Sequence, residues 1–458
     1  MKTYDSIVIG TGQAGPNLAF RLSEAGEKVA VIERHRFGGT CVNNGCVPTK
    51  TLVASAYAAY LAHHAGEFGI QIDGKITTDM KAVKARKDAI VQQFSQGVES
   101  WMDGLEKGTV YRGQAQFESP NTVRVGDELL EAKKVFINVG ARAFVPPIPG
   151  IETVDYLTNS TIMNVDTVPE HLIVIGGGYI GLEFGQMYRR FGSRVTVLAR
   201  GERVLSRDDE DVSAGIAEIL TGEGIEILTT LCDFTVSKKG SGVQVTVDCK
   251  GEIRTIDGSH LLVATGRVPN TDDLGLEKAG VRTNKRGFIE VDEQLRTSQE
   301  GIWALGDCNG RGAFTHTSYN DSEIVADNLL KGQTRRLSDR IPAFALYTDP
   351  PLGRVGMSEK EVRASGRPAL IATMPMSRVG RAKERGETRG FMKVLVDAET
   401  KEILGASLLG LGCDEIIHIL IDVMYAKAPY TTIERAMHIH PTVAELLPTL
   451  FAELKPLN

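Results

Sequence analysis

The chain has 458 residues, 42% of them hydrophobic and 24% charged, and its formal net charge at pH 7 is −6. A chain of this length is expected to form several domains with substantial cores. The acidic balance and the lack of a basic stripe exclude nucleic acid as an expected partner, and no apolar run is long enough to suggest a membrane span. Because four of the six cysteines stand singly and form no disulfide framework, we expect a reducing, cytoplasmic environment.

The chain begins with a predicted strand, a glycine turn, a helix and a second strand. The turn fits the pattern G-x-G-x-x-G at Gly10, Gly12 and Gly15, and the second strand, 29–33, ends in Glu33. Glycines allow the backbone to approach a pyrophosphate, whose charge the helix N-terminus stabilises. A carboxylate at the strand end can accept hydrogen bonds from ribose hydroxyls. This order predicts a Rossmann-like dinucleotide-binding unit.

Two cysteines, Cys41 and Cys46, lie five residues apart within Gly-Gly-Thr-Cys-Val-Asn-Asn-Gly-Cys-Val-Pro-Thr-Lys, residues 38–50. On a regular helix their Cα atoms would be ~8.6 Å apart, whereas a disulfide requires about 4.4–6.8 Å. A disulfide therefore needs a bent backbone, which Gly45 and Pro48 permit, and a bridge in so short a loop would be of the reducible kind. Two alternatives stay open on spacing alone: a pair of buried free thiols, or half of a metal site, although no second ligand pair is nearby.

The segment after the cysteines predicts two helices, 51–64 and 78–101. Strand-like segments follow and end in 135–140, whose last residue is Gly140. A proline-rich segment, 146–150, then predicts a linker.

A second unit repeats the first theme. The predicted strand 172–175 leads into the turn Gly-Gly-Gly-Tyr-Ile-Gly, residues 176–181, then a helix and a strand, 194–198. Two dinucleotide-binding units in one chain imply two bound nucleotides.

The residues that follow the strand 194–198 bear on the choice of coenzyme. Ala199 and Arg200 occupy the place where an acid would bind the 2′-hydroxyl of NAD and repel a 2′-phosphate. Arg200, with Arg203 and Arg207 as further candidates, favours NADPH, while NADH stays open. The alternative for one or more of these arginines is a solvated surface charge.

Strand and turn segments complete the second unit and return to the first. They cover 262–270 and 301–307, and the latter ends in Asp307, which could accept a hydrogen bond from a polyol hydroxyl or could be a turn aspartate. From about residue 341 the chain predicts strands with longer loops and then helices, with no third nucleotide motif. The basic segment 378–389 is expected to be a solvated surface, with a role in binding an anionic substrate as the alternative.

The C-terminal segment His440-Pro441-Thr442-Val443-Ala444-Glu445 permits two interpretations. Thr442 and Glu445 fit a capping box with a purely structural role. Alternatively, Glu445 orients and charges His440, as in an acid–base pair.

Together these elements resemble the FAD-dependent pyridine-nucleotide disulfide oxidoreductases, which include glutathione reductase, dihydrolipoamide dehydrogenase and mercuric reductase. The similarity covers essentially the whole chain, and its most specific part is the G-G-T-C-x4-C-x-P-x-K signature in 38–50. It implies an α/β fold with two Rossmann-like dinucleotide-binding domains and a C-terminal α+β dimerisation domain. The expected divisions are an FAD domain, 1–150 with 271–340, an NAD(P) domain, 151–270, and a dimerisation domain, 341–458.

The resemblance also implies which residues bind the two nucleotides. Glu33 would bind the adenosine ribose of FAD, Asp307 its ribityl chain, and Tyr179 would gate the nicotinamide pocket. The residues expected around FAD are Gly10, Gly12, Gly15, Glu33, Gly39, Thr40, Lys50, Gly140 and Asp307. Those expected around NADPH are Gly176, Gly178, Tyr179, Ile180, Gly181, Arg200, Arg203, Arg207 and Gly266.

The implied mechanism passes electrons from NADPH through FAD to a redox-active disulfide. Cys46 would lie against the flavin as the charge-transfer thiolate, and Cys41 would attack the substrate. Lys50 and Glu183 match an ion pair beside the flavin, and no resident metal is expected.

In this family the catalytic base comes from the other subunit. His440 would act as acid and base with Glu445 as its partner. The resemblance therefore implies an obligate homodimer, built by residues 341–458.

The electron acceptor is expected to be a small oxidant that is disulfide-like, mercuric or reactive. Ala199 and Arg200 resemble mercuric reductases, but those carry a C-terminal vicinal cysteine pair, and no cysteine follows Cys413 here. Residues 47–53 are similar to the reactive-chlorine resistance flavoproteins, which are associated with hypothiocyanite reduction or copper. The alternatives are a dihydrolipoamide dehydrogenase and, from another class, a non-catalytic flavin-binding subunit, for which intact cysteines and His440 would be unnecessary.

Overall fold

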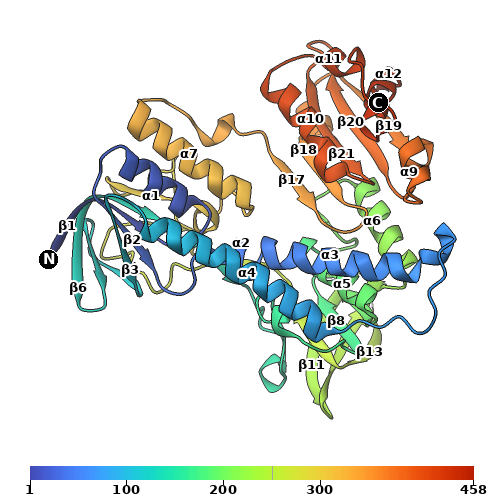
Figure 1. The fold of residues 1–458 in the computed structure, drawn as a ribbon, viewed down its shortest axis with the longest axis horizontal. Helices are drawn as coiled ribbons and strands as arrows, with labels where there is room; N and C mark the ends of the chain where they lie inside the picture. Colours follow the sequence, from blue (N-terminus) through green and yellow to red (C-terminus); the bar gives the residue numbers. More distant parts are fainter. Residues whose placement is uncertain (250, 458) are drawn as a thin grey trace.

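The computed structural model describes residues 1–249 and 251–457. It contains three parts with their own sheets, which in Figure 1 lie at the left (blue, teal and ochre), at the lower right (green) and at the upper right (orange to red). Helices alternate with parallel strands in the first two parts, and the third has an antiparallel sheet with helices beside it. The expected mixed α/β class is confirmed.

The first part is built on a seven-stranded sheet. Its strands are β1 (Lys2–Ile9), β2 (Val29–Glu33), β3 (Gly108–Arg112), β4 (Ala115–Ser119), β5 (Thr122–Val125), β6 (Glu128–Ile137) and β16 (Ile302–Ala304). The order is β3-β2-β1-β6-β5-β4, and β16 pairs with β6. β1, β2, β3, β6 and β16 pair in parallel. All of β2 is buried, as expected for a parallel strand that helices cover on both faces.

The α-helices of this part are α1 (Ala14–Glu24), α2 (Gly39–Asn44), α3 (Cys46–His63), α4 (Met80–Asp103) and α7 (Thr315–Lys331). Of these, α3 and α4 run across the centre of the molecule, whereas α1 and α7 lie at the left (Figure 1). The two helices expected at 51–64 and 78–101 are therefore present, but α3 begins five residues earlier than predicted. Its early start is possible because Pro48 lies in the first turn, where a missing N–H costs no helical hydrogen bond.

The second part combines a parallel sheet with an antiparallel one. Its elements are β8 (His171–Ile175), α5 (Tyr179–Phe191), β9 (Arg194–Leu198), α6 (Glu210–Gly222), β10 (Glu226–Leu228), β11 (Leu231–Lys239), β12 (Gly242–Cys249), β13 (Glu252–Gly258) and β14 (His260–Val263). The parallel order is β10-β9-β8-β14, and β11, β12 and β13 form an antiparallel meander. The meander was not predicted. Gly192, with φ of 114°, ends α5 and lets the chain turn into β9.

The third part is a six-stranded antiparallel sheet with helices beside it. Its elements are β17 (Ala343–Leu346), β18 (Leu352–Gly356), α8 (Glu359–Ser365), β19 (Ala369–Pro375), α9 (Gly380–Glu384), β20 (Phe391–Asp397), β21 (Ile403–Leu409), α10 (Cys413–Tyr425), α11 (Thr431–Glu434), α12 (Leu447–Ala452) and β22 (Lys455–Pro456). The order is β17-β18-β21-β20-β19-β22. The segment 378–389 is less solvated than expected: Ala382 is buried, and Arg389 pairs with Glu223 at 3.1 Å.

A small strand pair joins the first two parts. β7 (Ala141–Ala143) and β15 (Arg267–Pro269) pair antiparallel across the expected boundary between the FAD and NAD(P) domains. The domain divisions themselves stay a prediction. Among the described residues, no helix is long and apolar enough to span a membrane.

Candidate active site

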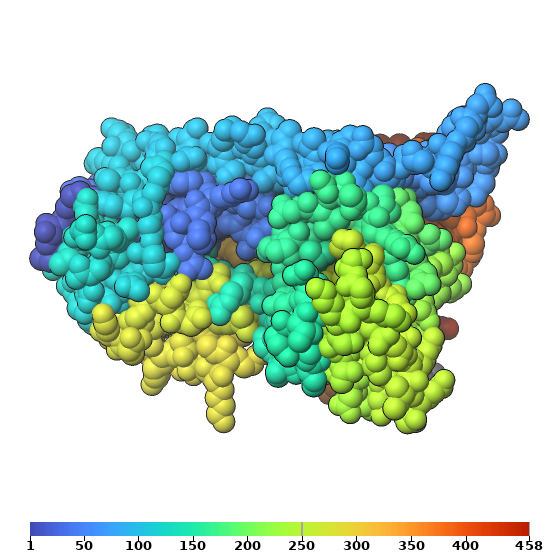
Figure 2. Space-filling view, turned by 90° about the horizontal axis from the view of Figure 1, so that it is seen from below, coloured from blue at the N-terminus to red at the C-terminus, as the bar shows by residue number. Residues whose placement is uncertain are grey.

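All three parts contribute to one cavity of about 1600 Å³. Figure 2 shows the first part (blue, teal and yellow) and the second (green) side by side, with a hollow between them. The expected site residues that line the cavity are Gly10, Gly12, Glu33, Gly39, Thr40, Cys41, Cys46, Lys50, Gly140, Tyr179, Ile180, Glu183 and Asp307. Those that do not line it are Gly15, Gly176, Gly178, Gly181, Arg200, Arg203, Arg207, Gly266, His440 and Glu445.

The first glycine turn packs so closely that side chains would not fit. Gly10 has φ of 99°, and a Cβ there would lie 2.4 Å from the Asn138 carbonyl oxygen. A Cβ on Gly15 would lie 2.1 Å from the Gly10 carbonyl oxygen. Asn138, which sequence analysis missed, donates to the carbonyl oxygens of Gly10 (3.2 Å) and Gly12 (3.1 Å). The turn thus presents bare backbone and the start of α1, a suitable cradle for a pyrophosphate.

Two carboxylates lie at the ends of strands that face this cavity. Glu33 accepts hydrogen bonds from the Thr11 N–H (3.0 Å), the Thr11 hydroxyl (2.6 Å) and the His35 N–H (2.8 Å). Asp307 lies 3.4 Å from the Arg267 Nε. Burial raises the pKa of Asp307, and the positive charge of Arg267 opposes that shift. Both carboxylates therefore have protein partners and still border the cavity, as a nucleotide site requires.

The cysteine pair lies where the backbone breaks between two helices. Cys41 belongs to α2, Cys46 is the first residue of α3, and Gly45 between them has φ −133° and ψ −121°. A Cβ on Gly45 would lie 2.8 Å from the Thr40 carbonyl oxygen. The expected bend at Gly45 is therefore confirmed. Both cysteines are free thiols in this structure.

The surroundings of the cysteine pair shift the pKa values of the two thiols in opposite directions. A hydrogen bond from the Cys41 thiol lowers the pKa of Cys46 to about 6, with the Thr315 hydroxyl and the positive charge of Lys50 contributing in the same direction. The Thr315 Oγ1 lies 3.2 Å from the Cys46 Sγ. The hydrogen bond to Cys46 and burial raise the pKa of Cys41. Cys46 is thus the thiol of the pair that ionises more readily.

An ion pair next to Cys46 connects the three parts. The Lys50 Nζ lies 2.8 Å from the Glu183 Oε2, which joins α3 to α5. The other oxygen of Glu183 accepts a hydrogen bond from the Tyr347 N–H (2.9 Å). Lys50 also lies 4.4 Å from the centroid of the Tyr347 ring. Tyr347, like Thr315, was not expected, since only the folded chain brings it to the cavity.

The second glycine turn has the same close packing as the first. Gly176 has φ of 128°, and a Cβ there would lie 2.3 Å from the Ala264 carbonyl oxygen. A Cβ on Gly181 would lie 2.1 Å from the Gly176 carbonyl oxygen. Gly178 faces open space at the start of α5. This turn can therefore also receive a pyrophosphate.

The three candidate arginines follow β9, where Ala199 is buried. Arg200 is exposed, with its guanidinium 5.3 Å from the centroid of the Phe234 ring. Arg203 pairs with Glu210 at 3.1 Å. Arg207 is exposed. Arg200 and Arg207 are consequently the more available cations of the three.

His440 and Glu445 contact each other but lie outside the cavity of their own chain. The His440 Nδ1 lies 2.9 and 3.1 Å from the two Glu445 carboxylate oxygens, and 80% of the His440 side chain is exposed. The Glu445 N–H donates to the Thr442 hydroxyl (3.2 Å). This is one of the two hydrogen bonds of a capping box. The Glu445 carboxylate contacts the His440 imidazole.

Among the residues that the structure describes, no group of three or more histidine, cysteine, aspartate or glutamate side chains is placed to hold a metal ion.

Family models match nearly the whole chain. The pyridine nucleotide-disulphide oxidoreductase model matches residues 4–322, and the dimerisation-domain model of the same family matches residues 342–451. The chain belongs to the pyridine nucleotide-disulphide oxidoreductases. The chain is therefore an oxidoreductase of a flavoprotein family that is FAD-dependent and uses pyridine nucleotides.

Relatives within the family carry several names. The probable pyridine nucleotide-disulfide oxidoreductase RclA of Escherichia coli is 38% identical over 464 residues, covering 99% of this chain and 100% of the relative. A mercuric reductase of Staphylococcus aureus is 33% identical over 95% of this chain and 81% of its own length. A dihydrolipoyl dehydrogenase of Geobacillus stearothermophilus is 34% identical over 96% and 94%.

Solved structures of an RclA flavoprotein also match this family member. The HOCl-induced flavoprotein disulfide reductase RclA of Escherichia coli superimposes with a TM-score of 0.89 and 36% identity, over 98% of this chain and 99% of the other. Its Cu(II) complex gives a TM-score of 0.90 over 99% of both chains. The likeness covers all three parts.

Proposed function

We propose that the chain is an NADPH-dependent FAD enzyme that passes electrons through a Cys41–Cys46 disulfide to a small oxidant. The observation that carries this proposal is the place of Cys46, whose Sγ lies 3.2 Å from the Thr315 Oγ1 in a cavity that the Lys50–Glu183 ion pair and a dinucleotide-binding turn also border. A thiolate at this place is the chemical form in which a cysteine acts as a nucleophile or electron donor.

The residues around the cavity suit FAD. Its pyrophosphate would lie on the first glycine turn, its adenosine ribose near Glu33 and its ribityl chain near Asp307. Gly39, Thr40, Lys50 and Gly140 would complete the site. Bound FAD would take a hydride from the nicotinamide and supply two electrons to the disulfide. Lys50, paired with Glu183, would hold a positive charge beside the ring.

The cysteines divide the chemistry between them. Cys41, once deprotonated, attacks the oxidised centre of the substrate and displaces the first leaving group. Cys46 then attacks the Cys41 sulfur, which releases the reduced substrate and closes the disulfide. Two electrons pass from the thiols to the substrate, and the His440 imidazole of a second copy takes the Cys41 proton and gives it to the leaving group. Glu445 orients that imidazole.

Dimerisation completes the site in this proposal. His440 is exposed in its own chain and does not border the cavity, so a second copy has to supply it. The family's dimerisation domain, matched at residues 342–451, supports a homodimer.

The choice of coenzyme rests on charge. Ala199 places no carboxylate where a 2′-phosphate would lie, and Arg200 and Arg207 present exposed cations on the following segment. NADPH is therefore the proposed donor, with its pyrophosphate on the second glycine turn and Tyr179, Ile180 and Gly266 near the nicotinamide end. Arg203 is tied to Glu210 and contributes less.

The proposed acceptor is a reactive, disulfide-like or mercuric oxidant of small size. The RclA structures that this chain resembles are described as those of an HOCl-induced flavoprotein disulfide reductase, one of them as a Cu(II) complex. The second candidate function is that of a dihydrolipoamide dehydrogenase, because one such relative is 34% identical. Turnover of hypothiocyanite would support the first proposal, whereas turnover of lipoamide would support the second.

The test is coenzyme consumption by the purified enzyme with NADPH and with NADH, against hypothiocyanite, mercuric ion, oxidised glutathione and lipoamide. We expect NADPH-driven turnover of hypothiocyanite or mercuric ion, lost in Cys46→Ser while FAD stays bound. Brisk NADH-driven reduction of lipoamide would contradict the proposal and assign the chain to the dehydrogenases.

A further inference from the structure

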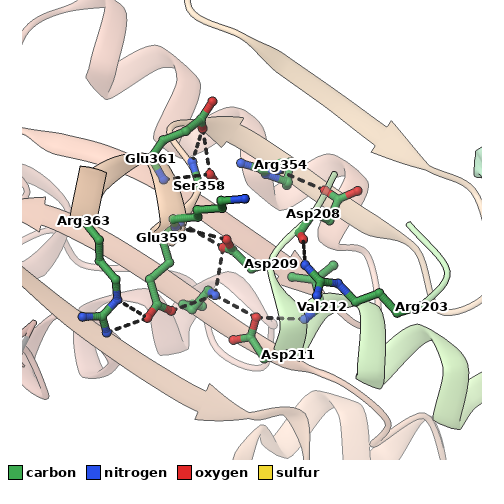
Figure 3. Close-up of polar contacts among 12 residues, drawn as sticks. Arg203, Asp208, Asp209, Asp211, Val212, Arg354, Ser358, Glu359, Glu361 and Arg363 are labelled. Atoms are coloured by element: carbon green, nitrogen blue, oxygen red, sulfur yellow. Dashed lines mark hydrogen bonds and ion pairs between the residues drawn. The ribbon is translucent and has the colours of Figure 1, made fainter. Parts of the chain in front are cut away.

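The hydroxyl of Tyr179 is tied to a buried ion pair. It donates a hydrogen bond to the Asp208 Oδ2 at 3.1 Å, and the Arg354 Nη1 donates to the Asp208 Oδ1 at 3.0 Å. Asp208 is 5% exposed and Arg354 6%. Figure 3 shows Arg354 pointing at the Asp208 carboxylate from the strand of the third part. A carboxylate buried this deeply needs such a partner, and Arg354 holds Asp208 in place.

The segment that carries Asp208 also carries the arginines proposed for the coenzyme. It joins β9 to α6 and includes Arg200, Arg203 and Arg207. Within it, the Arg203 Nη2 donates to the Asp208 carbonyl oxygen at 3.4 Å. One short segment thus links the place proposed for the 2′-phosphate with Tyr179.

The end of this segment is held by a second buried cation. Lys393, 1% exposed, donates to Asp209 (3.0 Å), Asp211 (2.8 Å) and Glu359 (3.2 Å). Asp209 also accepts the N–H of Glu359 at 3.0 Å. These contacts attach the segment to β20 and α8, and Figure 3 shows Asp209, Asp211 and Glu359 close together at this place. These contacts fix Asp209, the direct neighbour of Asp208 in the chain.

The Tyr179 ring lies against aromatic rings at the cavity. Its centroid is 5.4 Å from that of Phe344 and 6.4 Å from that of Phe314. Phe314 directly precedes Thr315, which contacts Cys46. Burial and the Asp208 charge raise the pKa of Tyr179, so its phenol remains a donor.

We propose that Asp208, fixed by Arg354, is a positioning residue that holds Tyr179 across the nicotinamide pocket, so that the nicotinamide enters only when the Tyr179–Asp208 hydrogen bond breaks. This inference rests on the proposed role of Tyr179 beside the nicotinamide. Because the competent, open state is then a minor one, the hydrogen bond weakens the apparent affinity for the coenzyme. Its loss should strengthen that affinity about three- to ten-fold, the effect of one net hydrogen bond.

The test measures binding of NADP⁺ to the FAD-loaded enzyme by titration calorimetry, with adenosine 2′,5′-bisphosphate as the matched ligand that lacks nicotinamide. Tyr179→Phe and Asp208→Ala, which each remove the hydrogen bond, should each lower the Kd for NADP⁺ about three- to ten-fold and leave the Kd for the bisphosphate unchanged. The double variant should gain less than about two-fold over Tyr179→Phe, because both changes remove the same bond. Glu218→Gln, at an exposed position of α6, is the control and should bind both ligands as the wild type does.

Stopped-flow reduction of the flavin by NADPH supplies the second measurement. Tyr179→Phe should raise the rate of flavin reduction at low NADPH. Any of three results would overturn the inference: equal shifts in Kd for both ligands, additive effects in the double variant, or no shift in Kd for Tyr179→Phe. The proposed function would stand in each case. A wild-type flavin that NADPH does not reduce would overturn the proposed function, and this inference with it.

Discussion

At the scale of single residues, the account depends on an unequal pair of thiols. The hydrogen bond from Cys41, the Thr315 hydroxyl and the Lys50 charge lower the pKa of Cys46 from 9.0 to about 6. The rate at which iodoacetamide alkylates Cys46 in the reduced enzyme should therefore rise with a midpoint near pH 6. Cys41→Ala should move this midpoint upward most, and Lys50→Met should move it less. A midpoint near 9 in the wild type would contradict the assigned thiolate.

The same shift predicts a pH dependence of stability for the reduced enzyme. Because the folded pKa of Cys46 lies below its ordinary value, the thiolate stabilises the folded state. This contribution is complete above pH ~9 and is lost as the pH falls toward 6. Denaturant titrations at several pH values give the free energies of unfolding of the wild type and Cys46→Ser. These two free energies should converge at the acid end of that range.

At the scale of elements, the break between α2 and α3 places the two sulfurs. A Cβ on Gly45 would lie 2.8 Å from the Thr40 carbonyl oxygen, so Gly45→Ala should displace the junction. We expect a loss of about 1–3 kcal/mol in the free energy of unfolding and a large loss of turnover. Gly97→Ala is the matched control, since Gly97 is an exposed position in α4 with open space around it. It should gain about 0.5–1 kcal/mol and retain turnover, and an equal response of both variants would contradict the role of the break.

Sequence patterns predicted the elements that are defined by a local run of apolar residues and by the glycines or prolines next to it. β2 and β9 match their predicted ranges because each is a short, buried run of largely β-branched residues. The start of α3 was placed too late because its first turn contains Pro48, which usually ends a pattern. The β11–β13 meander was not predicted, although β12 alternates valine with polar residues from Val243 to Asp248.

Contacts that form only in the folded chain could not be predicted from the sequence. Both glycine turns, the cysteine pair and the strand-end carboxylates follow local motifs and could be placed. Asn138, Thr315, Tyr347 and Arg354 carry no motif of their own and reach the cavity through tertiary packing. Functional side chains of this second kind can be identified only from the three-dimensional structure.

At the scale of the whole molecule, two copies should share each active site. His440 is exposed and outside the cavity of its own chain, so Cys46→Ser and His440→Ala should each be inactive alone. Mixed dimers refolded from equal amounts should regain roughly a quarter of wild-type turnover, because half the dimers carry one intact site. Turnover by His440→Ala alone, or none in the mixture, would contradict the shared site.

The central claim is that electrons from NADPH reach the Cys41–Cys46 pair. The most direct measurement counts free thiols in the unfolded enzyme before and after anaerobic addition of one equivalent of NADPH. The account predicts a gain of roughly two thiols per subunit in the wild type, since one two-electron reduction opens one disulfide. Cys46→Ser should gain none. A wild-type enzyme whose flavin loses its colour with no gain in thiols would contradict the claim.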